Sequence, residues 1–229
     1  MKSTEGESIS VETYRALRAS ILSGKIAPGT KVTTSVLCQT FDVSLGAVRE
    51  ALSRLHAEGL VSAESHRGYR VSPISIEDLR DLTRMRIDIE CICLQRSLER
   101  GDAKWEANLM AAAHLQTKGY TESRSNTYPN PALHELHRDY HRALVSACDS
   151  PRLLRLRDQL FDETERYRCM EAIVAPDRDP LEEHRLITEA ALARDVGRAQ
   201  RLLSEHFQRT SDALIQAMTA QSLVVQQRE

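Results

Sequence analysis

The chain has 229 residues, of which 41% are hydrophobic and 28% charged, and a formal net charge of −2. These values are ordinary for a globular protein with one large domain or two small ones. No run of about 18 uncharged apolar residues occurs, so we expect no membrane-spanning helix, and the polar N-terminus predicts no secretory signal. Five cysteines without a CxxC pair are typical of reduced thiols, which predicts a cytoplasmic protein.

Helical periodicity and a hairpin pattern organise the chain up to Pro73. Apolar residues recur at helical spacing over residues 10–23, and a shorter helix is predicted at residues 34–41. Ser44 is a natural N-cap for a third helix, and residues 60–71 predict two strands. This order is typical of a winged helix-turn-helix, so we predict a DNA-binding domain at residues 10–73 after a flexible N-terminus at 1–9.

The third helix and the hairpin tip carry the residue types that contact DNA. In a helix-turn-helix, the first residues of this helix reach base edges, and the preceding helix crosses the backbone. Arg49 lies one turn into the helix on its outer face, where a guanidinium can bind guanine or phosphate. We predict DNA contacts from Ser35, Ser44, Leu45, Gly46, Ala47, Arg49, His66, Arg67 and Gly68. The alternative is a winged helix that binds another protein and leaves Arg49 solvated.

The remainder of the chain is predicted to be an antiparallel all-α bundle at residues 74–219, followed by a flexible tail at 220–229. Helix starts are expected near residues 75, 102, 132, 150, 179 and 195, several of them at cap residues or at proline. The fold class is therefore mainly α, with one small hairpin in the N-terminal domain.

Histidines on the apolar faces of three helices form a candidate metal site. His134, His137 and His141 fall at i, i+3 and i+7, while His184 and His206 lie among apolar residues of later helices. Imidazoles at i and i+4 can bind one divalent metal, such as zinc or a nickel- or manganese-like ion. A single buried histidine is more often a hydrogen-bonded core residue, but four facing one interior favour a metal site.

Residues 43–60, Val-Ser-Leu-Gly-Ala-Val-Arg-Glu-Ala-Leu-Ser-Arg-Leu-His-Ala-Glu-Gly-Leu, resemble the recognition segment of GntR-family transcription regulators. Residues 21–30 are similar to the family's first-helix exit, and the bundle resembles the FCD domain of FadR-type members. The resemblance implies a homodimeric repressor that a small carboxylate effector releases from a pseudo-palindromic double-stranded DNA operator. Leu45 departs from the arginine that is usual there, which favours an apolar contact such as a thymine methyl.

The FCD resemblance also implies a metal held by an Asp or Asn and three histidines. His141, His184 and His206 match the three histidines, and His137 occupies the position of the usual Asp or Asn. Two interpretations stay open at this point. Either the four histidines bind a metal, or the cluster binds an anionic effector directly and holds none.

The effector is expected to be bound by arginines. Arg86 matches a pocket-lining arginine of the family's first bundle helix, and Arg166 and Tyr167 offer further anchors; the alternative for Arg86 is a surface ion pair with Glu90. Three stretches, residues 67–86, 101–106 and 165–168, look closest to the subgroup that represses glutarate catabolism in carbon starvation. This similarity implies a C4–C6 dicarboxylate such as glutarate or 2-hydroxyglutarate.

Two functions from other classes compete with a regulator. One is a metal-dependent enzyme. Two points argue against it: no carboxylate near the histidines is placed as an obvious general base, and an enzyme would not need a DNA-binding domain. The other is a winged-helix interaction protein that does not bind DNA. The sequence therefore predicts a protein that is not an enzyme and has no membrane partner.

Overall fold

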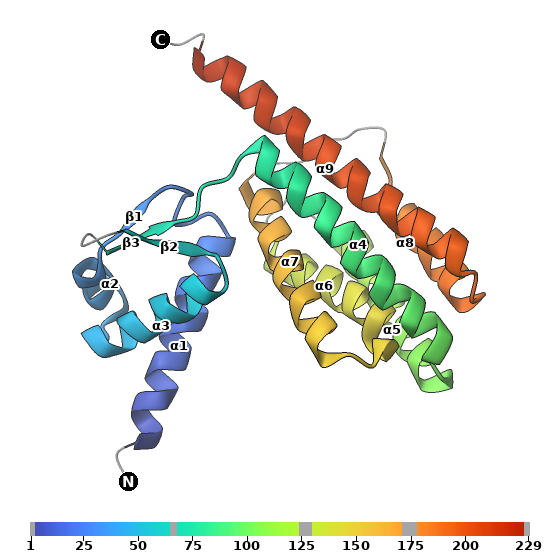
Figure 1. Ribbon diagram of the computed structural model, residues 1–229, viewed down its shortest axis with the longest axis horizontal. Coiled ribbons are helices and arrows are strands. Elements are labelled where there is room, and N and C mark those ends of the chain that lie inside the picture. The colour runs from blue at the N-terminus through green and yellow to red at the C-terminus, as the bar shows by residue number, and fades with distance from the viewer. Residues whose placement is uncertain (1–2, 65–67, 124–129, 171–177, 227–229) are drawn as a thin grey trace. The chain divides into compact units, whose positions relative to one another are not determined.

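The computed structural model describes residues 3–64, 68–123, 130–170 and 178–226 (Figure 1). The chain divides into two compact units, Met1–Ser75 with Glu165–Met170, and Ile76–Thr164 with Glu171–Glu229. Within the described residues, no helix is long and apolar enough to cross a membrane. The mainly helical fold class predicted from the sequence is confirmed.

The first unit is a winged helix-turn-helix. Its elements are α1 (Ser3–Leu22), β1 (Lys31–Val32), α2 (Thr34–Phe41), α3 (Leu45–Ala57), β2 (Val61–Glu64) and β3 (Gly68–Val71). The strands form an antiparallel sheet in the order β1-β3-β2 (Figure 1). Strand β1 was not predicted, because two residues are too short to show an alternating pattern. Helix α1 begins inside the segment for which a flexible N-terminus is predicted, and the flexibility itself stays a prediction.

The core of this unit fixes the orientation of α3. Val48, Leu52 and Leu55 are fully buried against Leu17 and Ile21 of α1. Because they recur at three- and four-residue spacing, they lie on one face of α3 and leave the opposite face exposed. Burial of three such side chains contributes several kcal/mol, at roughly 1.5–3 kcal/mol each.

One glycine shapes the start of β3. Gly68 has a φ of +96°, and a side chain there would place its Cβ 3.3 Å from the carbonyl oxygen of Val32. Glycine is therefore required where the chain enters β3 beside β1.

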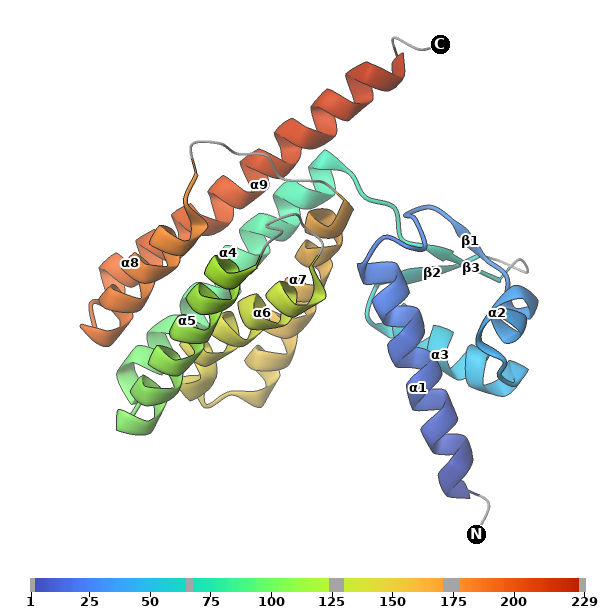
Figure 2. The ribbon, with the colours of Figure 1, turned by 180° about the vertical axis from the view of Figure 1, so that it is seen from behind.

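The second unit is a helical bundle, as predicted. Its elements are α4 (Ile76–Arg100), α5 (Ala103–Glu122), α6 (Pro131–Val145), a 3-10 turn (Ser146–Cys148), α7 (Pro151–Met170), α8 (Pro180–Leu192) and α9 (Val196–Gln226). Helices α4 and α9 lie side by side, α8 packs on α9, and α5 packs on α6 (Figures 1 and 2). Helices α5 and α9 extend beyond the predicted ends, and α7 contributes its last residues to the first unit.

Two of the three helices that carry the clustered histidines, α6 and α8, begin at a capping residue followed by proline. Asn130 precedes Pro131 and its side chain accepts from the amides of Ala132 and Leu133. Asp179 precedes Pro180 at the start of α8 in the same way. A side-chain acceptor followed by proline satisfies the free amides of the first turn and pre-sets the backbone, so the starts of α6 and α8 are well defined.

Candidate metal and effector site and DNA-binding surface

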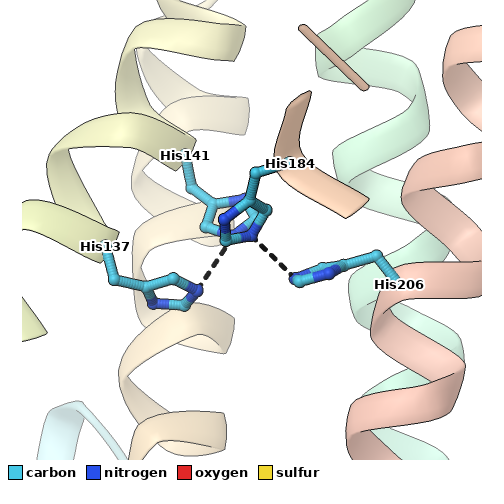
Figure 3. Close-up of side chains that lie close together, drawn as sticks. All are labelled: His137, His141, His184 and His206. Carbon is cyan, nitrogen blue, oxygen red and sulfur yellow. Dashed lines mark hydrogen bonds between the residues drawn. The ribbon is translucent and has the colours of Figure 1, made fainter. Parts of the chain in front are cut away.

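Four histidines from three helices converge in the bundle interior. His137 and His141 come from α6, His184 from α8 and His206 from α9, and all four are at most 5% exposed (Figure 3). The Nε2 atoms of His137 and His141 lie 3.1 Å apart, and those of His184 and His206 lie 3.2 Å apart. One ligand nitrogen from each residue falls within 4.8 Å of all the others. The predicted cluster is thus brought together by the fold.

Tyr140 ties two of these helices to one another. Its hydroxyl donates to the carbonyl oxygen of His184 at 3.0 Å, and its ring centroid lies 4.5 Å from that of His184. The side chain is fully buried, so this bond holds the start of α8 against α6 in the bundle interior. Tyr140 was not predicted as part of the site, because its partner lies on a different helix.

The donor set fits a divalent cation. Zinc–nitrogen bonds of about 2.1 Å in a tetrahedral site place ligand nitrogens about 3.4 Å apart, which small side-chain rotations of this cluster would reach. Burial holds the pKa of His141 well below its ordinary value of 6.5. The neighbouring His184 and His206, and then the charges of Arg86 and Arg157, lower this pKa further. A neutral imidazole offers the lone pair that a metal needs. The predicted set of His137, His141, His184 and His206 is therefore chemically suited to hold a metal.

A partly buried carboxylate, Glu183, orients one of the four rings. Glu183 Oε2 lies 2.7 Å from His206 Nδ1, and Arg178 Nη2 donates to the same oxygen at 2.7 Å. Burial raises the pKa of Glu183, but the hydrogen bonds from His206 and Arg178 outweigh it and lower the pKa to about 2. An ionised Glu183 accepts a hydrogen bond from Nδ1–H of His206, so the proton stays on Nδ1 and the lone pair of Nε2 faces the cluster.

Replacing Glu183 with glutamine is expected to weaken metal binding about 10- to 100-fold, the usual cost of losing the hydrogen-bond partner of a metal-ligating histidine. A competition titration against a chromogenic chelator measures the change. Glu182→Gln is the matched control, because Glu182 is the neighbouring residue and pairs with the exposed Arg185. Equal metal affinities of the two variants would contradict the orienting role of Glu183.

Protonation of His206 is expected to destabilise the metal-free protein as the pH falls. Burial chiefly lowers its pKa from 6.5 to about 4 in the folded protein, partly offset by the hydrogen bond with Glu183. The unfolded chain therefore binds more protons between these values, and the free energy of unfolding decreases as pH falls through this range. From about pH 7 to about pH 5 the loss from His206 alone is roughly 2 kcal/mol.

Urea unfolding at these two pH values in the presence of a chelator measures this loss. The comparison stops at about pH 5, above the ordinary pKa of the Glu183 carboxyl of 4.5. His206→Gln is expected to reduce the pH dependence, and an unchanged dependence in that variant would show that other groups cause it.

Two arginines and one carboxylate are buried beside the histidines. Arg157 Nε donates to Glu90 Oε1 at 2.9 Å, and Arg86 Nε lies 3.6 Å from the same oxygen. The guanidinium of Arg86 stacks on Phe207 at 4.1 Å, and His141 lies 5.6 Å from that ring. The Arg86–Glu90 pair exists but is buried, so the surface-pair alternative for Arg86 is wrong. Arg157 was not predicted, since the sequence of α7 does not distinguish it from solvated arginines.

The other predicted effector residues lie elsewhere in the structure. Arg166 donates to the carbonyl oxygen of Ser72, and the Tyr167 hydroxyl lies 3.4 Å from the carbonyl oxygen of Ser75. All four residues belong to the first unit. Both side chains thus contact the segment at residues 72–75. His134 also stays outside the cluster, where its Nε2 lies 3.2 Å from Arg138 Nη2.

The outer face of α3 and its surroundings form the candidate DNA-binding surface. Leu45 is 45% exposed at the start of the helix, and Gly46 and Arg49 are exposed beside it. Ser44 caps the helix by accepting from the amide of Ala47 at 3.3 Å. The side chain of Ala47 itself is buried and packs in the domain core. Ser35 and Gly68 are exposed, while the predicted contacts His66 and Arg67 lie outside the described residues.

Comparison with known proteins identifies the family. Residues 9–71 match the model of the bacterial regulatory proteins of the gntR family, and residues 81–209 match the FCD domain. The chain belongs to the GntR family and carries an FCD domain. A GntR-family member of this kind is a DNA-binding transcription regulator and not an enzyme, so the predicted class is confirmed and the enzyme alternative is set aside.

Relatives of this GntR regulator cover most of its length. It is 38% identical over 198 residues to the uncharacterized HTH-type transcriptional regulator BphR of Paraburkholderia xenovorans, covering 86% of this chain and 81% of that one. It is 34% identical over 217 residues to the HTH-type transcriptional repressor GlaR of Escherichia coli, covering 91% and 97%. The E. coli McbR/YncC structure superposes with a TM-score of 0.75 at 21% identity over 91% and 97% of the two chains, a likeness of fold.

Proposed function

We propose that this protein is a homodimeric, cytoplasmic repressor that leaves its operator when a C4–C6 dicarboxylate, such as glutarate or 2-hydroxyglutarate, binds in the FCD domain. The observation that carries this proposal is the buried cluster of four histidines next to two guanidinium groups. The domain limits follow the sequence, with a DNA-binding domain at residues 10–73 and an effector-binding and dimerisation domain at 74–219.

The charge of the cluster favours an anionic effector. With His137 in place of an acidic ligand, all four donors are neutral, so a bound divalent ion keeps its full positive charge. Arg86 and Arg157 add two positive charges nearby, against one negative charge from Glu90. Charges in a low-dielectric interior need compensation, and an effector carboxylate supplies it.

Different residues of the site would bind the metal and the effector carboxylate. His137, His141, His184 and His206 would hold the metal, which offers a carboxylate oxygen a positively charged binding point. Imidazole ligands suit zinc and nickel, so these ions are the first to test. Arg86 is buried and stacked on Phe207, which orients its planar guanidinium for the other carboxylate oxygen. The arrangement of donors thus selects for a carboxylate and not for a neutral sugar or base.

The proposal that this protein represses transcription rests on similar proteins, since GlaR and RspR of E. coli are both named repressors. In a dimeric helix-turn-helix protein, two recognition helices bind the half-sites of a pseudo-palindrome, whose spacing reflects the two-fold symmetry. The effector releases the operator because it binds more tightly to the arrangement of the domains that does not fit DNA.

An operator-release assay tests this function. The purified protein first selects its operator from a random DNA library, and gel shifts then follow release by a panel of C4–C6 dicarboxylates with zinc, with nickel and with a chelator. Release by a dicarboxylate at micromolar to millimolar concentration is expected. If the protein selects a specific operator but no member of the panel releases it, the proposed effector class is wrong. If it selects no DNA at all, the proposed function as a DNA-binding regulator is wrong.

A further inference from the structure

The interior next to the histidines carries an excess of positive charge. Arg86, Glu90 and Arg157 have side chains that are 4%, 0% and 0% exposed. Both guanidinium groups share one carboxylate, so the trio has a net charge of +1. A buried net charge is costly unless a partner of opposite charge is present when the protein works.

The hydrogen bonds of Arg157 involve two of its three guanidinium nitrogens. Its Nε donates to Glu90 Oε1 at 2.9 Å, and its Nη1 donates to Asp158 Oδ1 at 2.9 Å. Asp158 also accepts from Arg142 Nη2 at 2.9 Å, so its charge is shared. The third nitrogen, Nη2, is buried and has no hydrogen-bond partner in the described part of the chain. Buried guanidinium nitrogens normally have partners, which points to a ligand that supplies one.

Phe161 connects Arg157 to the histidine site. The guanidinium of Arg157 lies 5.0 Å from the centroid of this ring, and that of Arg86 lies 4.9 Å from it. His137 and His141 pack against the same ring, with centroid distances of 5.6 and 6.1 Å. One buried aromatic side chain therefore contacts both guanidinium groups and two of the four histidines, so Arg157 lies in the layer of side chains that surrounds the histidine cluster.

We propose that Arg157 binds the second carboxylate of a dicarboxylate effector, whose first carboxylate binds at the histidine cluster with Arg86. This inference rests on the proposed function and names the residue that distinguishes diacids from monoacids. Arg157 is a specificity residue, since a monocarboxylate of the same length reaches the histidine cluster but offers Arg157 no anion.

Calorimetric titration of the full-length protein with glutarate and with pentanoate, the monoacid of the same length, tests this role. The wild-type protein is expected to prefer glutarate. In Arg157→Gln, the dissociation constant for glutarate is expected to rise about 10- to 100-fold, as for loss of a charged hydrogen bond, and that for pentanoate to stay within about twofold. A purely structural role would weaken both acids equally.

Two further variants complete the experiment. Arg142→Gln removes the same charge and a bond to the same Asp158 from an exposed position, and is expected to leave the preference unchanged. Glu90→Gln with Arg157→Gln removes both members of the buried pair, so it keeps the test available if the single variant does not fold. Wild-type protein that binds no C4–C6 diacid overturns the proposed function, and this inference with it. If the wild-type protein binds glutarate and Arg157→Gln still prefers glutarate to pentanoate to the same extent, only the inference about Arg157 is wrong.

Discussion

Protein in which His141 is replaced by alanine is expected to bind zinc or nickel about 100-fold more weakly than the wild-type protein. His141 is the fully buried member at the centre of the cluster, with ring centroids of His137, His184 and His206 at 4.6, 5.2 and 5.4 Å. Structural zinc binding of about 10–16 kcal/mol over four ligands leaves about 3 kcal/mol for each, which corresponds to this change in affinity. Elemental analysis after gel filtration, followed by chelator competition, measures it.

His134→Ala is the matched control for this experiment. His134 lies on the same helix two turns earlier, outside the cluster, so its loss is expected to leave metal affinity unchanged. Circular dichroism confirms that both variants are folded. Wild-type protein that carries no metal after exposure to zinc and nickel would favour the alternative in which the cluster binds the effector directly.

The second large effect is expected at the DNA-binding surface. Arg49→Ala is expected to weaken operator binding about 10- to 100-fold, because a bidentate arginine–guanine contact contributes roughly 1–3 kcal/mol. Arg49 is exposed, so the free energy of unfolding and the metal affinity should not change. Fluorescence anisotropy with the selected operator measures the loss, at a stated salt concentration.

Arg54→Ala serves as the control on the same helix. Arg54 is 43% exposed and pairs with Glu50 at 2.5 Å near the C-terminal end of α3, away from the turn that enters the groove. It is expected to lose at most a small electrostatic contribution. Equal operator affinity of wild type and Arg49→Ala would show that α3 does not read DNA through this residue, and would favour the hypothesis of a protein-binding winged helix.

Local patterns in the sequence predicted a large part of this molecule. Helix α2 has the predicted bounds, and Ser44 caps α3 as expected, since both depend on neighbouring residues. The four histidines could be assigned to one interior because each lies on an apolar face of its own helix. Periodicity is a property of single elements, so it transfers directly from sequence to structure.

Residues whose role depends on a distant partner were not found in this way. Arg157 stands in a charged stretch of α7, and only its pairing with Glu90, on a helix far away in the chain, shows that it is buried. Glu183 is adjacent to His184 in sequence but bonds to His206 instead. Arg166 and Tyr167 were predicted as further effector anchors, and the structure places them against Ser72 and Ser75. Such pairings depend on how helices pack, which no local pattern contains.

The arrangement of the histidines on three separate helices also links metal supply to folding. A bound ion would connect residue 137 on α6 with residue 206 on α9 and act as a reversible cross-link. Because the unfolded chain cannot present this donor set, an ion at about 1,000 times its dissociation constant adds about 4 kcal/mol to the free energy of unfolding. We therefore expect the melting temperature to fall when a chelator is added. In a cell, the amount of intact regulator would then follow the availability of the metal, independently of any effector.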